Sequence, residues 1–221
     1  MELDVLDRSV FQCYGPDEDI PDISPSDLET EENFVNYNGV EDNEDVATEV
    51  KRMHGLKYTA RFDTWEETVA FCGDTPILSK FGNIEKIRNG KKKTRVVLDQ
   101  KRSGISKAAK RFERAALPKV LDVVFEALDL CDCDSARDIC DSILEFFVCD
   151  VKDAFFVMPN HPKERKYFVY RFRGKYYVAL RSTQGSRVAP LTWSRTAALI
   201  SRLTQSVTGP NRSRMLATTQ S

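Results

Sequence analysis

The acidic and basic residues of this chain are separated along its length, and this separation limits where a core can form. Residues 1–50 contain sixteen acidic residues and a single basic one, Arg8, for a net charge of −15. The whole chain sums to −1, so the remaining residues carry +14. A segment with this charge excess and no sustained apolar period does not collapse. We therefore predict a disordered acidic tail over residues 1–48, followed by a folded body. The tail could bind a partner, imitate nucleic acid and screen the body, or be a solvated extension.

The basic charge of the body is concentrated in two segments. Residues 85–114 hold twelve Lys and Arg against three acids, and residues 161–214 hold twelve against Glu164 alone. Such density is typical of proteins that bind a polyanion.

The chain shows no membrane or export signal. No apolar run reaches the roughly 18 residues of a membrane-spanning helix, and MELDVLDRSV lacks the basic and then apolar layout of a signal peptide. We predict an intracellular protein of the cytoplasm or nucleus that is neither secreted nor membrane-bound. Its six cysteines then favour free thiols, and a zinc site among Cys131–Cys149 is the less favoured alternative because paired CxxC spacing is absent.

The apolar spacing predicts a mixture of helices and hairpins. A short helix is expected within residues 63–74, capped by Asp63 or Thr64 and ended by Gly73. Two strands should meet at the turn Asn89–Gly90. Pro118 suits the first turn of a following helix.

The second half repeats this alternation. The apolar run ILEFFVCD predicts a strand that ends at Asp150, and KYFVYRF and KYYVALRS predict a hairpin around Gly174. A final helical stripe runs through residues 190–207. The sequence therefore predicts an α+β fold.

Asp150 is the strongest candidate for chemistry. Asp153 follows it three residues later, Phe155 and Phe156 come next, and basic segments lie on both sides. Carboxylate oxygens suit Mg²⁺, and neighbouring cations offset phosphate charge. The simpler alternative is that Asp150 caps the next turn.

Three ordered motifs within residues 76–207 resemble those of reverse transcriptases, the RNA-directed DNA polymerases of retrotransposon and retrovirus-like Pol polyproteins. DVKDAF (150–155) resembles the first catalytic motif of that family. TRVVLDQKRSG (94–104) resembles the fingers segment, and RSTQGSRVAPLTWSR (181–195) resembles the second palm motif.

The resemblance implies a role for each matching residue. Asp150 would bind the catalytic Mg²⁺ with the Val151 carbonyl, and Phe155 would exclude a ribose 2′-hydroxyl. Asp153 and Asp99 would be structural. The residues implied to surround the bound dNTP are Arg95, Lys91, Lys92, Lys93, Asp153, Ala154, Phe155 and Gln184. Those implied to contact the template are Gln184, Gly185, Arg187 and Pro190.

The implied architecture is a partial right-hand polymerase. Residues 49–115 would be a fingers-like segment, residues 116–207 an incomplete palm with an antiparallel sheet packed on helices, and residues 208–221 a loose tail. The expected partners are an RNA or DNA template with primer, dNTP, and the missing C-terminal part of the polymerase.

Two departures from the family pattern limit the expected activity. Arg187–Val188 stands where many relatives have a small residue after the Gln-Gly pair. The family also needs an aromatic-x-Asp-Asp motif, and this sequence has no Asp-Asp dipeptide. Two-metal nucleotidyl transfer needs more than one carboxylate, so we expect little or no polymerase activity from these residues alone. The alternatives are a non-catalytic nucleic-acid-binding module and an inert relic of a retroelement.

Overall fold

The chain forms helices and antiparallel sheets, as expected for an α+β protein. The computed structural model describes residues 23–31, 34–88, 90–109, 119–132, 146 and 148–208. The chain divides into two compact units. Unit 1 comprises Met1–Pro16, Phe112–Lys152 and Pro190–Ser221, and unit 2 comprises Asp17–Arg111 and Asp153–Ala189. The boundary that the sequence predicted near residue 115 lies outside the described residues.

The first sheet of unit 2 has three antiparallel strands in the order β1-β5-β4. They are β1 (Thr59–Phe62), β4 (Val169–Phe172) and β5 (Lys175–Ala179). The predicted hairpin around Gly174 is confirmed, because β4 and β5 pair directly across it. Two short 3₁₀ helices, η2 (Ala154–Val157) and η3 (Pro162–Tyr167), precede β4.

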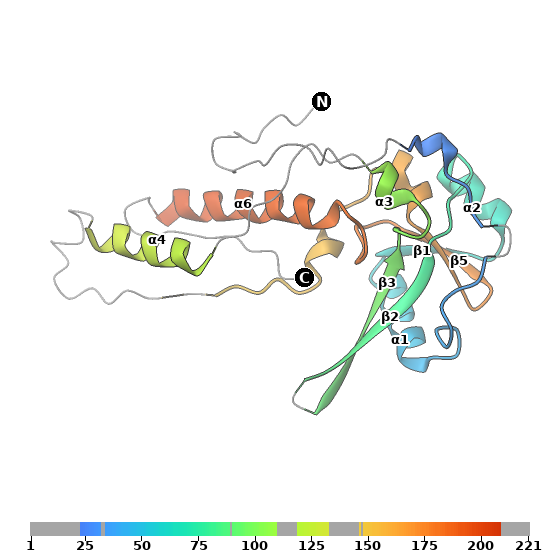
Figure 1. Cartoon of the computed structure of the whole chain (residues 1–221), viewed down its shortest axis with the longest axis horizontal. Coiled ribbons are helices and arrows are strands. Elements are labelled where there is room, and N and C mark those ends of the chain that lie inside the picture. Colours follow the sequence, from blue (N-terminus) through green and yellow to red (C-terminus); the bar gives the residue numbers. More distant parts are fainter. Residues whose placement is uncertain are drawn as a thin grey trace. The chain divides into compact units, whose positions relative to one another are not determined.

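The second sheet is a long hairpin of β2 (Lys80–Arg88) and β3 (Lys91–Asp99). Its register runs from Lys80 opposite Asp99 to Arg88 opposite Lys91, which confirms the predicted turn. Gly90 supplies the positive φ of 72° that this turn requires. The hairpin extends away from the rest of unit 2 (Figure 1).

Two short helices of unit 2 flank the hairpin in the sequence, one before β2 and one after β3. The predicted helix at residues 63–74 is confirmed as α2 (Trp65–Cys72). The side chain of Thr64 and that of Glu67 form a reciprocal capping box at its start, and Gly73 closes it in the left-handed conformation. A single-turn helix, α3 (Ile105–Ala108), follows the loop after β3.

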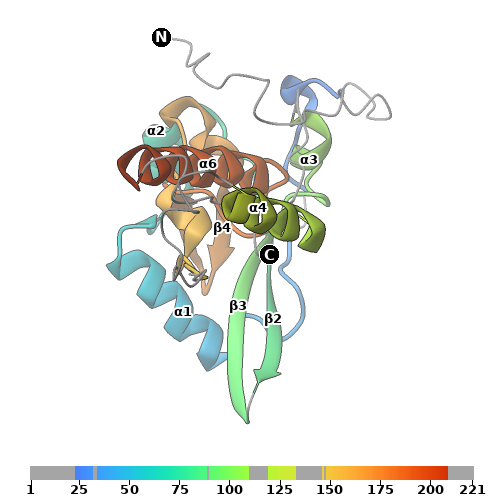
Figure 2. The same ribbon diagram turned by 90° about the vertical axis from the view of Figure 1, so that its left-hand side faces the viewer.

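The prediction of a disordered tail over residues 1–48 is wrong for residues 34–48. Residues 1–22 lie outside the described residues, but residues 34–48 pack on the body, with Val40 and Val46 only 1% and 0% exposed. Helix α1 (Glu44–Gly55) begins within the predicted tail and lies beside β3 (Figure 2). The few apolar positions of this window form one buried stripe, and that stripe is obscured in the sequence by the surrounding acids.

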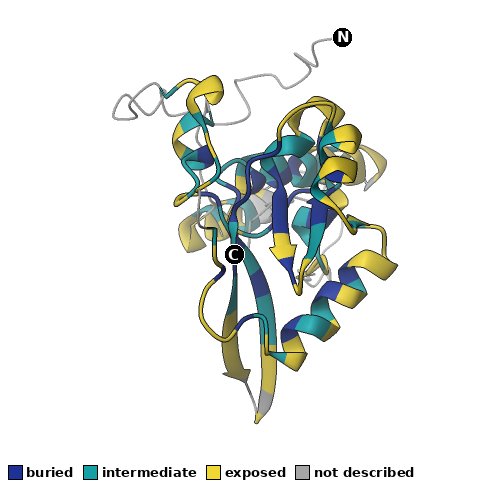
Figure 3. Cartoon of the chain, turned by 90° about the vertical axis from the view of Figure 1, so that its right-hand side faces the viewer, coloured by how far each residue is buried: buried dark blue, intermediate teal, exposed yellow. Residues whose placement is uncertain are grey.

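The core of unit 2 is aromatic. Tyr170 lies between Phe81 and Tyr177, with stacked rings whose centroids are 4.3 and 5.1 Å away. Met53 of α1 and Val96 of β3 belong to the same buried cluster. Along the hairpin, the buried residues lie near its base, and the described residues near its tip are exposed (Figure 3).

The described part of unit 1 is helical. It contains α4 (Val120–Asp132) and α6 (Ala189–Thr208), which confirms both predicted helices. The predicted strand ending at Asp150 is wrong for residues 148–150, which are irregular, while residues 143–145 and 147 are not among those described. A strand requires a neighbour to take its backbone hydrogen bonds, and no described strand pairs with these residues. No helix in the described ranges is long and apolar enough to cross a membrane.

Candidate nucleic-acid interface

The β2–β3 hairpin presents two different faces, because side chains alternate along each strand. One face carries Val96 and Leu98, which are buried in the core. The other carries Arg95 and Lys93, which lie directly opposite Ile84 and Lys86 of β2. The hairpin therefore separates a packed face from a basic face.

Lys92 lies on the packed face, and its ammonium group forms ion pairs with two carboxylates. Its ammonium group is 2.9 Å from a carboxylate oxygen of Asp45 in α1 and 2.9 Å from one of Glu85 in β2. The hydrogen bond to Asp45, followed by that to Glu85, raises the pKa of Lys92 above its ordinary value. Lys92, one of the predicted nucleotide-binding residues, thus joins the hairpin to α1 in this structure.

Lys93 and Arg95 lie on the basic face and are not engaged in this way. Neither has an ion pair or a side-chain hydrogen bond with any residue that the structure describes. Lys86 and Lys93 are exposed, and Ile84 beside them is 49% exposed. The exposed Lys86 and Lys93, the half-buried Arg95 and the apolar Ile84 therefore share this face. Lys91 is in β3, but its side chain lies outside the described part.

Gln184 and Gly185 are held against the edge of β3. The amide of Leu98 donates a hydrogen bond of 3.1 Å to the carbonyl oxygen of Gln184. Gly185 adopts φ = +98°, and a Cβ atom there would lie 2.0 Å from the Leu98 carbonyl oxygen. Only glycine permits this approach. The structure thus brings two predicted template-contact residues to the hairpin that carries Arg95.

Arg187 supports the same loop. Its guanidinium donates a hydrogen bond of 3.1 Å to the carbonyl oxygen of Ser106 in α3. This contact connects the loop after Gly185 to the segment that follows β3.

Asp153 is held by α1. Arg52 contacts its two carboxylate oxygens, at 2.7 and 3.3 Å, and also pairs with Glu49 at 2.8 Å. The hydrogen bond with Glu49, together with that to Asp153, raises the pKa of the Arg52 guanidinium above its ordinary value. Asp153 has a left-handed φ of 55° at the start of η2. These contacts agree with a structural role for Asp153, and no local pattern in the sequence pointed to Arg52 as its partner.

The residues after Asp153 are partly packed. Phe156 is buried, and its ring stacks on Tyr58 with centroids 4.9 Å apart. Ala154 and Phe155, the predicted nucleotide-binding neighbours, are half-buried.

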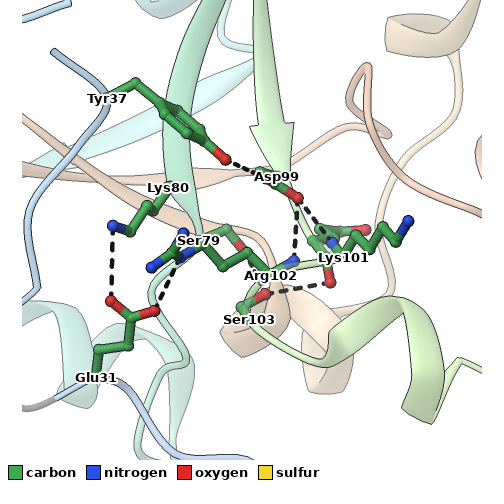
Figure 4. Close-up of polar contacts among 9 residues, drawn as sticks. Glu31, Tyr37, Ser79, Lys80, Asp99, Lys101, Arg102 and Ser103 are labelled. Atoms are coloured by element: carbon green, nitrogen blue, oxygen red, sulfur yellow. Dashed lines mark hydrogen bonds and ion pairs between the residues drawn. The ribbon is translucent and has the colours of Figure 1, made fainter.

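Asp99 also has a structural role. Its carboxylate accepts hydrogen bonds from the backbone amides of Lys101 and Arg102, at 3.1 and 3.0 Å, and from the hydroxyl of Tyr37 (Figure 4). It thereby closes the turn after β3. Tyr37 was missed because it lies in the segment interpreted as a tail.

Asp150, Val151 and Pro190 belong to unit 1 and are exposed. Asp150 is the predicted Mg²⁺ ligand. Among the described residues, however, no group of three or more His, Cys, Asp or Glu side chains could hold a metal ion. Asp153, the other acid of the motif, is paired with Arg52. The described residues do not complete a Mg²⁺ site, so no chemical step through the metal follows from them.

Comparisons with known proteins give a distant structural likeness. No protein-family model matches the chain, and no curated protein sequence does. Among solved structures, the chain is similar to a foamy viral protease-reverse transcriptase in complex with double-stranded DNA, with a TM-score of 0.47 and 12% sequence identity. The match covers 86% of this chain and 28% of that chain, so this chain spans little more than a quarter of the viral polypeptide. A likeness this distant does not by itself assign a family or an activity.

Proposed function

We propose that this chain is a nucleic-acid-binding part of a reverse-transcriptase-like polymerase, with the β2–β3 hairpin in the position of the fingers. The open basic face of that hairpin is the observation that carries the proposal. Lys86, Lys93 and Arg95 gather on one face and form no ion pair with the acidic residues that the structure describes.

The chemistry of this face suits phosphate groups. The guanidinium of Arg95 can donate two parallel hydrogen bonds to phosphate oxygens, whereas Lys86 and Lys93 act as point charges. Gln184 and Gly185 lie against β3, so residues of two separate motifs are close to each other in space. This proximity supports a shared nucleic-acid surface. In the proposed complex, Arg95 and Lys93 bind the phosphates of dNTP or of the template, and Phe155 lies near the sugar.

Nucleotidyl transfer would require a site with more carboxylates than the described residues bring together. Asp150 would be one Mg²⁺ ligand of that site. We therefore expect these 221 residues to bind a primer–template duplex without extending the primer.

The test is a salt titration of binding. A fluorescently labelled primer–template duplex is titrated with the chain at roughly 50 to 200 mM KCl, where each phosphate contact contributes about −0.9 to the slope of log K against log salt. Arg95→Ala should weaken binding and make the slope shallower by about one. Lys51→Ala, which removes an exposed cation of α1, serves as the matched control and should leave the slope unchanged. Equal losses in the two variants would reject the hairpin as the binding surface.

A further inference from the structure

The basic face of the hairpin continues to its base, where Glu31 contacts the cations. Lys80 is opposite Asp99 on the same face as Ile84 and Arg95, because the two pairs are separated by an even number of positions along each strand. Arg102 follows β3 and lies close to Lys80 (Figure 4). The cations nearer the tip have no acidic partner among the described residues, whereas Lys80 and Arg102 at the base form ion pairs.

The contact at the base comes from residues 23–31, which we call the N-terminal arm. Glu31 binds both basal cations: one carboxylate oxygen accepts from the Arg102 Nε at 3.1 Å, and the other lies 3.7 Å from the Lys80 ammonium group (Figure 4). The arm also contains Asp27 and Glu29 and has no basic residue. Its charge is therefore opposite to that of the surface it covers.

The arm is attached by few contacts. Besides the two ion pairs of Glu31, the hydroxyl of Thr30 accepts a hydrogen bond of 3.0 Å from the Leu78 amide. The side chain of Leu28 lies against Gly104. The Glu31 carboxylate remains 46% exposed, and ion pairs at such exposure stabilise a fold little and are screened by salt.

The chain after the arm is anchored much more firmly. Asn36 is buried, accepts a hydrogen bond of 2.9 Å from the Phe81 amide and donates one of 2.6 Å to the Arg171 carbonyl oxygen. Departure of the arm would therefore leave the core contacts of this segment in place.

We propose that Lys80 and Arg102 form a second phosphate-binding surface at the base of the hairpin, and that the N-terminal arm covers it in the free protein. Nucleic acid bound to Arg95 and Lys93 would extend along the same face and displace Glu31 by competing for both cations. This inference rests on the proposed function, since it assigns a further surface and an internal competitor to the same nucleic-acid ligand.

The test compares two charge-neutralising variants in the full chain. Glu31→Gln frees Lys80 and Arg102, whereas Glu66→Gln removes the same charge from an exposed position of α2. With a labelled primer–template duplex, Glu31→Gln should bind more tightly and show a steeper slope of log K against log salt, by up to about two, because Lys80 and Arg102 bind phosphate without first breaking the salt-sensitive ion pairs with Glu31. Glu66→Gln should match the wild-type slope.

Hydrogen exchange provides a readout in the unmodified protein. Adding the duplex should accelerate exchange of the Leu78 amide, which Thr30 protects, and leave the Phe81 amide unchanged, because Asn36 remains in place. Equal slopes for the two variants with unchanged Leu78 exchange would overturn the covering role, while binding through the hairpin would stand. Absence of duplex binding by every variant at low salt would overturn both this inference and the proposed function.

Discussion

At the scale of single residues, Gly185 is the position where side-chain size matters most. Its φ of +98° is strained for any residue with a Cβ atom, and that atom would lie 2.0 Å from the Leu98 carbonyl oxygen. Gly185→Ala must therefore push the Gln184 loop away from β3 and break the hydrogen bond between Leu98 and Gln184. We expect a loss of about 3 kcal/mol in the free energy of unfolding, measured by urea denaturation.

Gly174→Ala separates conformational strain from steric clash. Gly174 also has a positive φ, +71°, but an added Cβ atom would meet nothing within 4 Å. This variant should cost only about 1–2 kcal/mol. Equal losses in the two variants would show that the close contact with β3 is not what makes Gly185 necessary.

Some individual residues could be singled out from the sequence, but their contact partners could not. The Gln184–Gly185 pair was singled out from its motif, and the resemblance implied a structural role for Asp99 and Asp153. Their partners Tyr37 and Arg52 lie 62 and 101 residues away in the sequence. No local pattern specifies such pairings, because they depend on how α1 and its preceding segment fold back onto the strands.

At the scale of elements, the hairpin combines a stable base with an unfavourable charge arrangement near its tip. Lys86 and Lys93 are direct cross-strand partners, and like charges in that position destabilise a sheet. Lys93→Glu should therefore stabilise the hairpin by a few tenths of a kcal/mol. The same change should weaken duplex binding and make its salt slope shallower.

The two effects can be measured together. Thermal unfolding reports the stability change, and anisotropy with a labelled duplex reports binding. Lys51→Glu reverses the charge of an exposed residue on α1 and controls for net charge. A variant Lys93→Glu that is more stable yet binds as tightly as Lys51→Glu would argue that the pair has no role in binding.

Elements with strong local signals were predictable. Both hairpins have glycine turns, and α2 has both of its caps in the sequence, so their positions followed from chain chemistry. Helix α1 was missed because only Val46, Val50 and Met53 are apolar and buried in an otherwise charged stretch. Its stability comes from packing against the aromatic core, which is a tertiary effect.

At the scale of the whole molecule, exposed ion pairs and hydrogen bonds join the strands of the hairpin and segments of unit 2 that are distant in the sequence. Asp74 pairs with Lys166, Glu85 with Lys92, and Glu31 with Arg102. The partner named in each case is the main reason that the pKa of the carboxyl lies below its ordinary value of 3.8 for Asp or 4.5 for Glu. These carboxylates must therefore ionise for the segments to stay joined.

The pH dependence of stability follows from the sign of these shifts. A carboxyl whose pKa is lower in the folded than in the unfolded protein stabilises the fold above its unfolded pKa, and this stabilisation is lost as pH falls through the folded pKa. Burial alone would raise the pKa of Asp99, but the Tyr37 hydroxyl and the Arg102 and Lys101 amides outweigh it and hold the pKa down. With respect to these carboxyls, we expect the free energy of unfolding to be level above about pH 5 and to fall below roughly pH 4.

Urea denaturation across this range would measure the fall, and Asp99→Asn tests its origin. This variant should be less stable near neutrality, because an amide replaces the charged acceptor of Tyr37, Lys101 and Arg102. It should also lose less stability on acidification, because it has one fewer carboxylate to protonate. An acid fall as steep in Asp99→Asn as in the wild-type chain would show that the turn after β3 does not contribute to it. The sensitivity would then reside in the remaining pairs, among them the one between Glu31 and Arg102 that holds the N-terminal arm.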